Sequence, residues 1–372
     1  MRVKLVDPSA YTPPYDHALC HALAQQGADV ELITSEFAYG DVPAPDGYRS
    51  NQFFYRHARG PAGSKLRLAT KLAEHVPDML RLRRSATRSA DVVHFQWLSV
   101  QPLDVHLLPR TPLVLTAHDL FPREPRPGQV RAQRRLYDAV DAVIVHSEAG
   151  RTGLLDGAAI DPSKVHVVHH GAFTHLAATT SAPLAPELTT TTRPVVLFFG
   201  LIRPYKGVDV LLDAWRDITD AELWVVGRPR MDTSDLKAKA PPSVRFIERF
   251  VSDVELPAFF DRADIVVLPY KRTERIDASG VLFTALGFGK AIVVTDVGGF
   301  GEVASTGAAT LVAPDDASAL TDALKTLIDD PAARAALQAN ARAVANGPYS
   351  WSDAAAKTLK VYETAKPTES AP

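Results

Sequence analysis

Short runs of apolar residues alternate with helical patterns along most of the chain, and this alternation constrains the fold more than any other feature. The runs are rich in Val, Ile and Leu and almost continuous, which is typical of strands buried on both faces of a parallel sheet. They lie at residues 3–7, 29–34, 91–95, 112–118, 142–147, 164–171, 195–200, 222–227, 244–247, 265–270 and 291–296. The sequence therefore predicts α/β layers built on doubly wound parallel sheets.

One segment between the two halves of the chain breaks this pattern. Residues 176–194, LAATTSAPLAPELTTTTRP, are dominated by Pro, Thr, Ser and Ala and show no apolar periodicity, as is usual for a linker. The 372 residues are enough for two separate cores. We therefore expect Rossmann-like domains at residues 1–175 and 195–346, a last helix within 347–366, and a disordered tail at 367–372. Ligands of such sheets bind at the carboxyl ends of the strands, so a cleft between the domains is the expected site.

The loop that follows the run at 195–200 carries the pattern of a phosphate site. The segment LFFGLIRPYKGVDVLLDAW ends its apolar run at Gly200, continues through Arg203 and Lys206, and enters a helix after Gly207. Glycine lets the backbone approach phosphate oxygens, the helix N-terminus offers free N–H groups, and the two cations neutralise charge. The order matches neither a Walker A loop nor G-x-G-x-x-G. Loops of this kind also carry glycine and surface cations for turn geometry and solubility alone, so both interpretations stay open.

A second loop is expected at the same edge of the sheet. Ser279 and Gly280 precede an apolar helix, with Ser279 in the position of an N-cap and Val281 in the first turn. The N–H groups of this helix end are placed to share a diphosphate with Arg203 and Lys206. Ser-Gly before a helix is also common capping chemistry, so this loop alone does not decide between the two roles.

In the first half of the chain, LVLTAHDLFP places His118 at the carboxyl end of a predicted strand. A histidine in such a place hydrogen-bonds a ligand hydroxyl or stabilises developing charge, although a structural histidine fits the same position.

Composition excludes several classes of protein. The formal net charge of -2 argues against bulk nucleic-acid binding, which usually needs a basic domain. A single cysteine, Cys20, excludes an internal disulfide and a cysteine-rich metal site, and it is compatible with a reducing cytosol. The chain opens without the apolar region of a secretory signal, and no apolar run approaches the roughly 20 residues needed to span a bilayer. We expect a soluble, cytoplasmic protein.

Two basic segments leave their role open. Their cations are Lys65, Arg67, Lys71, Arg81, Arg83, Arg84 and Arg88 in the first, and Arg123, Arg126, Arg131, Arg134 and Arg135 in the second. Such segments dock on anionic membranes, but a solvated helix face or cations for an anionic acceptor explain them equally well.

Taken together, these elements resemble the retaining glycosyltransferases of family 4, which have the two-domain GT-B fold. The resemblance is strongest from Val195 to Val303, through FFGLIRPYKGVDVLLDA, ELWVVG, FVSDVEL, ADIVVLPY and SGVLFTALGFGKAIVVTDVGG. ADVVHFQ, LTAHDL, VIVHSE and VVHHG match more loosely in the first half. SWSDAAAKTLKVY resembles the family's closing helix, which usually crosses back onto the N-terminal domain.

The resemblance implies a role for each matching residue. Arg203 and Lys206, with Gly200 and the N–H groups near Ser279, Gly280 and Val281, would hold the diphosphate of a nucleotide sugar. His118 would lie beside the donor sugar at the reaction centre. A sugar would then pass to an acceptor hydroxyl of a glycan, glycolipid or small molecule, with retained configuration and without a metal or another cofactor.

One departure from the family pattern concerns two glutamates that the family usually carries eight positions apart. Ile276 and Thr284 occupy those positions here. Asp277 is adjacent to the first position and would substitute for it as a catalytic carboxylate, with Glu274 a second stand-in, whereas Thr284 would make a weaker contact to the donor ribose or sugar. The departure motivates a competing hypothesis, a nucleotide-sugar-binding scaffold on a catalytically decayed transferase fold.

Overall fold

The computed structural model describes residues 1–61, 63–122, 127–272 and 278–366. Several features predicted from the sequence lie outside the described residues. They are the candidates Asp277 and Glu274, the departure at Ile276, the basic residues Arg123 and Arg126, and the expected tail at 367–372. The chain divides into two compact units, the first formed by residues 1–171 with the segment that begins at Trp351, and the second by residues 172–350.

The first unit is built on a fully parallel sheet in the order β3-β2-β1-β4-β5-β6-β7. Its strands are β1 (Arg2–Asp7), β2 (Asp29–Thr34), β3 (Arg49–Gln52), β4 (Val92–Phe95), β5 (Leu113–Thr116), β6 (Ala142–Val145) and β7 (Val165–Val167). The helices of this unit are α1 (Pro13–Gln25), α2 (Lys65–Ser89), α3 (Gln101–Leu107), α4 (Gln129–Ala139), α5 (Glu148–Gly157) and α15 (Trp351–Ala365).

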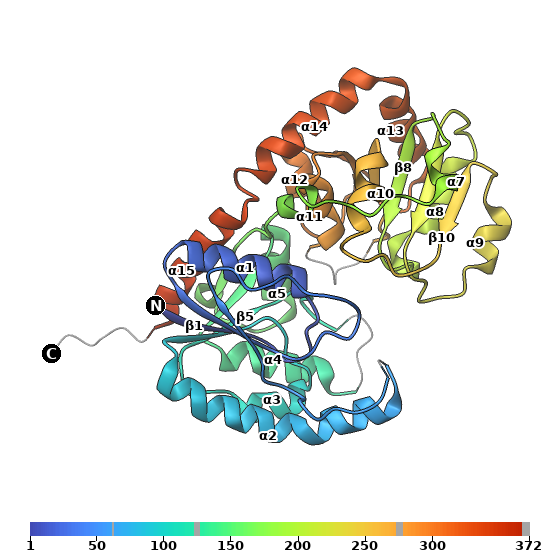
Figure 1. Cartoon of the computed structure of the whole chain (residues 1–372). Helices are drawn as coiled ribbons and strands as arrows, with labels where there is room; N and C mark the ends of the chain where they lie inside the picture. Colours follow the sequence, from blue (N-terminus) through green and yellow to red (C-terminus); the bar gives the residue numbers. More distant parts are fainter. Residues whose placement is uncertain (62, 123–126, 273–277, 367–372) are drawn as a thin grey trace. The chain divides into compact units, whose positions relative to one another are not determined.

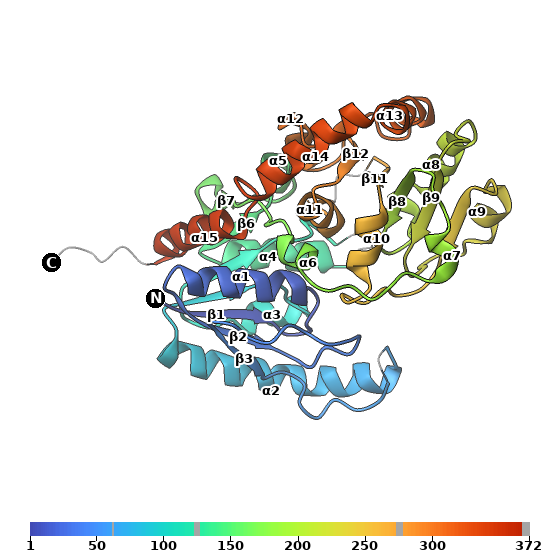
Figure 2. The same cartoon turned by 45° about the horizontal axis from the view of Figure 1, so that its top comes forward.

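Two cores fill the faces of this sheet. Side chains from α2, α4 and α5 cover one face, and side chains from α1 and α15 cover the other. Helices α1 and α15 run side by side along the sheet although most of the chain separates them (Figures 1 and 2). Tyr362 of α15 is fully buried, and its hydroxyl lies 2.7 Å from Nδ1 of His94 within β4. The last helix therefore completes the core of the first unit.

The second unit repeats this architecture with a parallel sheet in the order β10-β9-β8-β11-β12-β13. Its strands are β8 (Val195–Phe199), β9 (Glu222–Val226), β10 (Val244–Ile247), β11 (Ile265–Leu268), β12 (Ala291–Thr295) and β13 (Thr310–Val312). Its helices are α6 (Thr174–Ala177), α7 (Pro186–Thr189), α8 (Val208–Trp215), α9 (Ser234–Lys239), α10 (Leu256–Arg262), α11 (Gly280–Gly287), α12 (Phe300–Ser305), α13 (Ala317–Asp329) and α14 (Pro331–Ala345).

The predicted α/β class is confirmed, and every predicted apolar run contains a strand. Two strands were missed. The edge strand β3 reads RSNQ and is largely exposed, so it carries no apolar signal, and β13 has only three residues. Both sheets reverse their strand order beside their first strand, between β1 and β4 and between β8 and β11. Ligands of open α/β sheets bind at the carboxyl ends of the strands that flank such a point.

Candidate functional site

The loop after β8 lies at the point where the second sheet reverses its order. The strand ends at Gly200, whose φ is +112°, and a short 3-10 turn over Pro204–Lys206 follows. Gly207 closes the turn with φ +70°, and a Cβ at this residue would lie 1.9 Å from the carbonyl oxygen of Pro269. The loop is therefore pressed against the end of β11 in a way that only glycine permits.

Lys206 of this loop is held in the interior by a tyrosine. Its side chain is buried, and Nζ donates to the hydroxyl of Tyr270 at 2.6 Å while lying 4.7 Å from the centre of the tyrosine ring. The hydroxyl of Tyr270 in turn lies 2.9 Å from Oγ of Ser279. A chain of contacts thus connects the predicted lysine to the start of α11.

The backbone at Gly200 marks the place where the predicted residues converge. A Cβ built on Gly200 would lie 3.3 Å from both Nζ of Lys206 and Cγ2 of Val281. The structure therefore brings Gly200, Lys206, Ser279 and Val281 together, although they come from loops after two different strands.

Arg203 lies in the same loop with its guanidinium only partly exposed. Its backbone is extended, and its buried Nε has no hydrogen-bond acceptor. Arg203 forms no ion pair with any residue in the part of the chain that the structure describes. A buried donor without an acceptor is rare in native proteins, and an anionic ligand would satisfy it.

The N-terminus of α11 offers further donors. Ser279 occupies the N-cap position, but its side chain makes no capping hydrogen bond because the hydroxyl meets Tyr270 instead. The predicted N-cap position is therefore confirmed, but the side chain of Ser279 does not cap the helix. The N–H groups of Gly280 and Val281 have no acceptor among the described residues, and a Cβ on Gly280 would meet nothing within 4 Å. N–H groups without an acceptor at a helix N-terminus form an anion-binding arrangement.

Thr284 lies one turn further along α11. It is buried, and its hydroxyl donates to the carbonyl oxygen of Gly280 at 2.8 Å. The helix itself thus uses the donor of Thr284, and only the oxygen lone pairs remain for a ligand.

His118 lies in the first unit, where it follows β5 and borders a cavity of about 240 Å³. Its ring stacks on that of Trp97, with centres 5.0 Å apart and planes inclined by 15°, and it meets the edge of Tyr15 at 4.7 Å. Nε2 of His118 hydrogen-bonds Oε1 of Gln96 at 3.0 Å, and Nδ1 lies 3.4 Å from Nε2 of His146.

This environment keeps His118 neutral at pH 7. Burial, followed by the neighbouring rings of His146, His170 and His94, holds the pKa of His118 well below its usual value. Burial also lowers the pKa of His146 to about 4. A neutral imidazole both donates and accepts a hydrogen bond, which suits contact with a hydroxyl.

Sequence reasoning missed the residues that hold these predicted ones in place. Tyr270 was visible as the last residue of IVVLPY, and Gln96 and Trp97 directly follow the run at 91–95. Their place after a buried strand is a signal that they lie at the ligand edge of a sheet. Their side-chain partners could not be read, since these contacts join distant parts of the chain.

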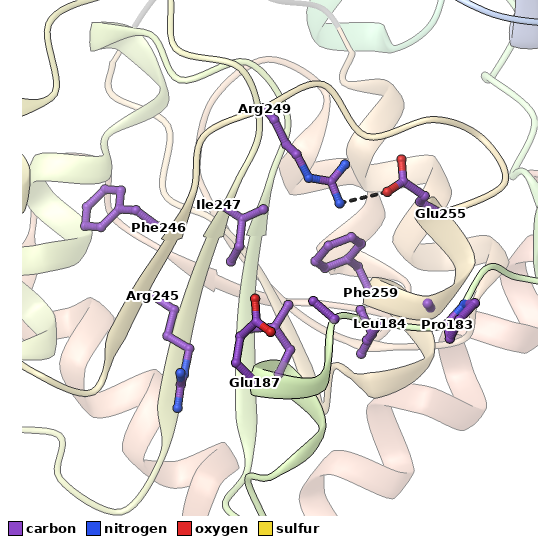
Figure 3. A pocket seen from close by; sticks show the side chains of 12 residues that line it. Pro183, Leu184, Glu187, Arg245, Phe246, Ile247, Arg249, Glu255 and Phe259 are labelled. Atoms are coloured by element: carbon purple, nitrogen blue, oxygen red, sulfur yellow. Dashed lines mark ion pairs between the residues drawn. The ribbon is translucent and has the colours of Figure 1, made fainter.

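A cavity of about 290 Å³ in the second unit is lined by none of the predicted site residues. It lies between α7, β10 and α10 (Figure 3). Both of its arginines are already paired: Arg249 with Glu255 at 2.7 Å, and Arg245 with Glu222 at 2.9 Å. The charges at this cavity are therefore neutralised, unlike that of Arg203.

Two family models match most of the chain. Residues 15–175 match a family model described as Glycosyltransferase Family 4, and residues 193–330 match one described as Glycosyl transferases group 1. The chain is 28% identical to D-inositol 3-phosphate glycosyltransferase of Kineococcus radiotolerans, over 93% of this chain and 88% of that protein. It is 30% identical to GDP-mannose:glycolipid 4-beta-D-mannosyltransferase of Xanthomonas campestris pv. campestris, over 60% of this chain and 68% of that protein.

The fold also resembles that of solved structures. The Anabaena protein HepE, in complex with UDP and glucose, superposes with a TM-score of 0.71 at 20% identity, over 98% of this chain and 99% of HepE. At this identity the likeness concerns the fold, which is that of the GT-B glycosyltransferases.

Proposed function

This chain belongs to the glycosyltransferases of family 4, and we propose that it transfers a sugar from a nucleotide diphosphate sugar to an acceptor hydroxyl with retention of the anomeric configuration. The observation that carries the proposal is the arrangement around Gly200. It combines the unsatisfied Nε of Arg203, the buried ammonium of Lys206 and the N–H groups of Gly280 and Val281, which have no acceptor among the described residues. Retention is supported by the family resemblance.

The chemistry of such a transfer explains why these groups are needed. When the bond between the sugar and the diphosphate breaks, the leaving nucleoside diphosphate gains negative charge. Donors and cations already in place at a site sheltered from water stabilise that charge without reorganisation. In our proposal Arg203 and Lys206, with the N-terminus of α11, supply this stabilisation, and the site requires no metal ion.

His118 serves the sugar side of the reaction in this proposal. Its ring is fixed by Trp97 and Gln96, and it is neutral at pH 7, so it hydrogen-bonds a sugar hydroxyl without adding a full charge. From the sequence we also propose that Asp277 acts as a catalytic carboxylate and that Thr284 contacts the donor ribose or sugar.

The names of the relatives suggest donors and acceptors to test. Mannose from GDP-mannose, a glycolipid acceptor and an inositol phosphate acceptor appear in those names, and HepE was crystallised with UDP. The nucleotide is therefore to be established by a screen against UDP, GDP, ADP and dTDP and their sugar conjugates.

The experiment is a thermal-shift screen of the wild type, Lys206→Ala and the matched control Lys237→Ala. Lys237 belongs to α9 and pairs with Glu248. At a ligand concentration 100-fold above Kd, the donor adds about 2.7 kcal/mol of stability, which raises Tm by roughly 5–10 °C. Lys206→Ala removes a charge-assisted contact of about 1.5–3 kcal/mol, so affinity falls more than tenfold, while Lys237→Ala shifts like the wild type.

Two outcomes would contradict the proposal. If no nucleotide raised the Tm of the wild type, the result would favour the decayed scaffold. The comparisons, by contrast, favour the active transferase. A shift that survives in Lys206→Ala would remove Lys206 from the diphosphate site. Transfer or hydrolysis of the identified donor above background would eliminate the scaffold hypothesis.

A further inference from the structure

The loop between β1 and α1 is built around a buried carboxylate. Asp7, the last residue of β1, is fully buried and accepts hydrogen bonds from three backbone N–H groups of the loop that follows. Oδ1 accepts from Ser9 at 3.2 Å, and Oδ2 accepts from Tyr11 at 2.5 Å and from Thr12 at 3.2 Å. A buried charge costs much free energy unless it is hydrogen-bonded, so the conformation of the loop and the burial of the carboxylate depend on each other.

A second carboxyl group lies beside the first. Asp16 of α1 is also buried, and its carboxyl group shares a hydrogen bond with Asp7. Burial, together with the charge of Asp7, raises the pKa of Asp16 well above its usual value. Burial raises the pKa of Asp7 as well, but the three N–H groups and Asp16 oppose that shift. Asp16 is therefore the member of the pair that retains a proton, and Asp7 is the carboxylate.

The backbone of this loop is strained. Ala10 has a φ of +50°, a left-handed conformation that alanine rarely adopts, and its N–H donates to the carbonyl oxygen of Asp7 at 3.3 Å. Oγ of Ser9 lies 2.9 Å from Oγ of Ser99, which ties the loop to the segment after β4. Strain of this kind persists only where the surrounding contacts impose the conformation, and it is concentrated at functional sites.

The loop holds the indole of Trp97 on two sides. Oγ1 of Thr12 accepts a hydrogen bond from Nε1 of Trp97 at 3.0 Å, and the centre of the Tyr11 ring lies 5.4 Å from that of the indole. Trp97 in turn stacks on His118, and Tyr11, Trp97 and His118 border the same cavity of about 240 Å³. Asp7 is not among the described residues that line this cavity. An effect of Asp7 on His118 must therefore pass through the loop and Trp97.

From these contacts we propose that Asp7 is a positioning residue for the sugar transfer. Its carboxylate fixes the β1–α1 loop, the loop fixes the indole of Trp97, and the indole fixes the plane of the His118 ring. The inference rests on the proposed role of His118 in that reaction. A small displacement of a group at the reaction centre costs a large factor in rate, even when its cause lies further away.

The substitution Asp7→Asn tests the geometry by ¹⁵N–¹H NMR of the tryptophan indole groups. In either orientation of the new amide, its NH2 group faces a backbone N–H that the carboxylate now accepts, so the loop should loosen. The chain has four tryptophans, and Trp97→Leu identifies the signal of Trp97. This signal should move and exchange faster with solvent in Asp7→Asn, while the other three stay unchanged. The matched control is Asp161→Asn, a loop aspartate of the same unit that accepts the N–H of Ser163 at 2.9 Å, and it should leave all four signals in place.

Transfer kinetics test the consequence for the reaction. With the donor and acceptor identified, kcat of Asp7→Asn should fall roughly tenfold or more, while Kd for the nucleotide, which we place on the second unit, stays unchanged. The double variant Asp7→Asn/Trp97→Leu should lose no more than Trp97→Leu alone, because Asp7 acts through Trp97. Thr12→Val removes only the acceptor of the indole N–H and should move the Trp97 signal and kcat in the same direction. It tests the inference even if Asp7→Asn does not fold.

Three outcomes would overturn the inference. They are a Trp97 signal that neither Asp7→Asn nor Thr12→Val moves, a kcat that neither changes, and losses of Asp7→Asn and Trp97→Leu that multiply in the double variant. Failure of the proposed function has a different signature. A wild type without transfer, or a His118→Ala variant as active as the wild type, would remove the reaction or the role of His118. The NMR measurement would still decide whether Asp7 holds Trp97 in place.

Discussion

Tyr270 contacts two groups of the candidate diphosphate site at once. Its hydroxyl accepts a hydrogen bond from the ammonium of Lys206 and forms a second one with Oγ of Ser279. The same ammonium also lies over the face of the tyrosine ring. A flexible lysine otherwise gives up side-chain entropy when it binds a ligand. We therefore assign Tyr270 a positioning role, in which it holds Lys206 beside Gly200 before the nucleotide arrives.

The substitution Tyr270→Phe tests this role, because it removes the hydroxyl and keeps the ring. The lost hydrogen bond is a contribution of about 0.5–1.5 kcal/mol, so Kd for the nucleoside diphosphate should rise by roughly threefold to tenfold. Isothermal titration calorimetry measures the change, with Tyr39→Phe, a half-exposed tyrosine of the first unit, as the control. Equal affinities in the wild type and Tyr270→Phe would show that the hydroxyl does not position Lys206.

At the scale of elements, the start of α8 and the start of α11 use glycine for different reasons. Gly207 has a positive φ and sits against the carbonyl of Pro269, so the β8–α8 loop depends on it for its shape. Gly280 begins α11 beside open space and is under no such restraint. The first glycine serves the fold, and the second lies beside space that we propose for the diphosphate.

Alanine at the two positions should therefore have opposite effects. Gly207→Ala places a Cβ against backbone in a strained conformation, and we expect a loss of about 1–3 kcal/mol in the free energy of unfolding. Gly280→Ala should leave stability equal or raise it by up to about 1 kcal/mol, yet weaken nucleotide binding because the methyl group fills the open space. Denaturant unfolding and calorimetry separate the two quantities. If Gly207→Ala had the same free energy of unfolding as the wild type, Gly207 could not be packed against the carbonyl of Pro269.

At the scale of the whole molecule, the first unit is not continuous in sequence. Residues 1–171 form its sheet, and α15, which follows the entire second unit in the chain, supplies part of its core. The ring of Tyr362 is fully buried there, and its hydroxyl meets His94. The first unit is thus complete only after the last helix has been made.

The substitution Tyr362→Ala should expose this dependence. Loss of a fully buried aromatic ring costs about 3–5 kcal/mol, whereas Tyr362→Phe loses one hydrogen bond and costs about 1 kcal/mol. Nucleotide binding, which we place on the second unit, should persist below the melting temperature of each variant. Equal stabilities of the Ala and Phe variants in denaturant unfolding would show that α15 does not support the core.

The sequence by itself determined the α/β class and the positions of most strands, and it predicted Gly200, Arg203 and Lys206 as residues of a diphosphate site. Strands buried on both faces of a sheet must be apolar throughout, and a loop that holds phosphate needs glycine and cations close together, so both signals are local. The sequence also showed an excess of cations at residues 65–88 and left their role open.

Only the tertiary structure decided which distant residues meet. The contact of Tyr270 with Lys206, the stacking of Trp97 on His118 and the place of Tyr362 beside His94 all join segments far apart in the chain. The edge strand β3 is polar because it is exposed, so no apolar run marks it. Periodicity cannot decide which leucines of α2 are buried. Leu82 packs in the core whereas Leu66, Leu68 and Leu72 stay exposed, because burial is a property of the assembled core rather than of any single helix.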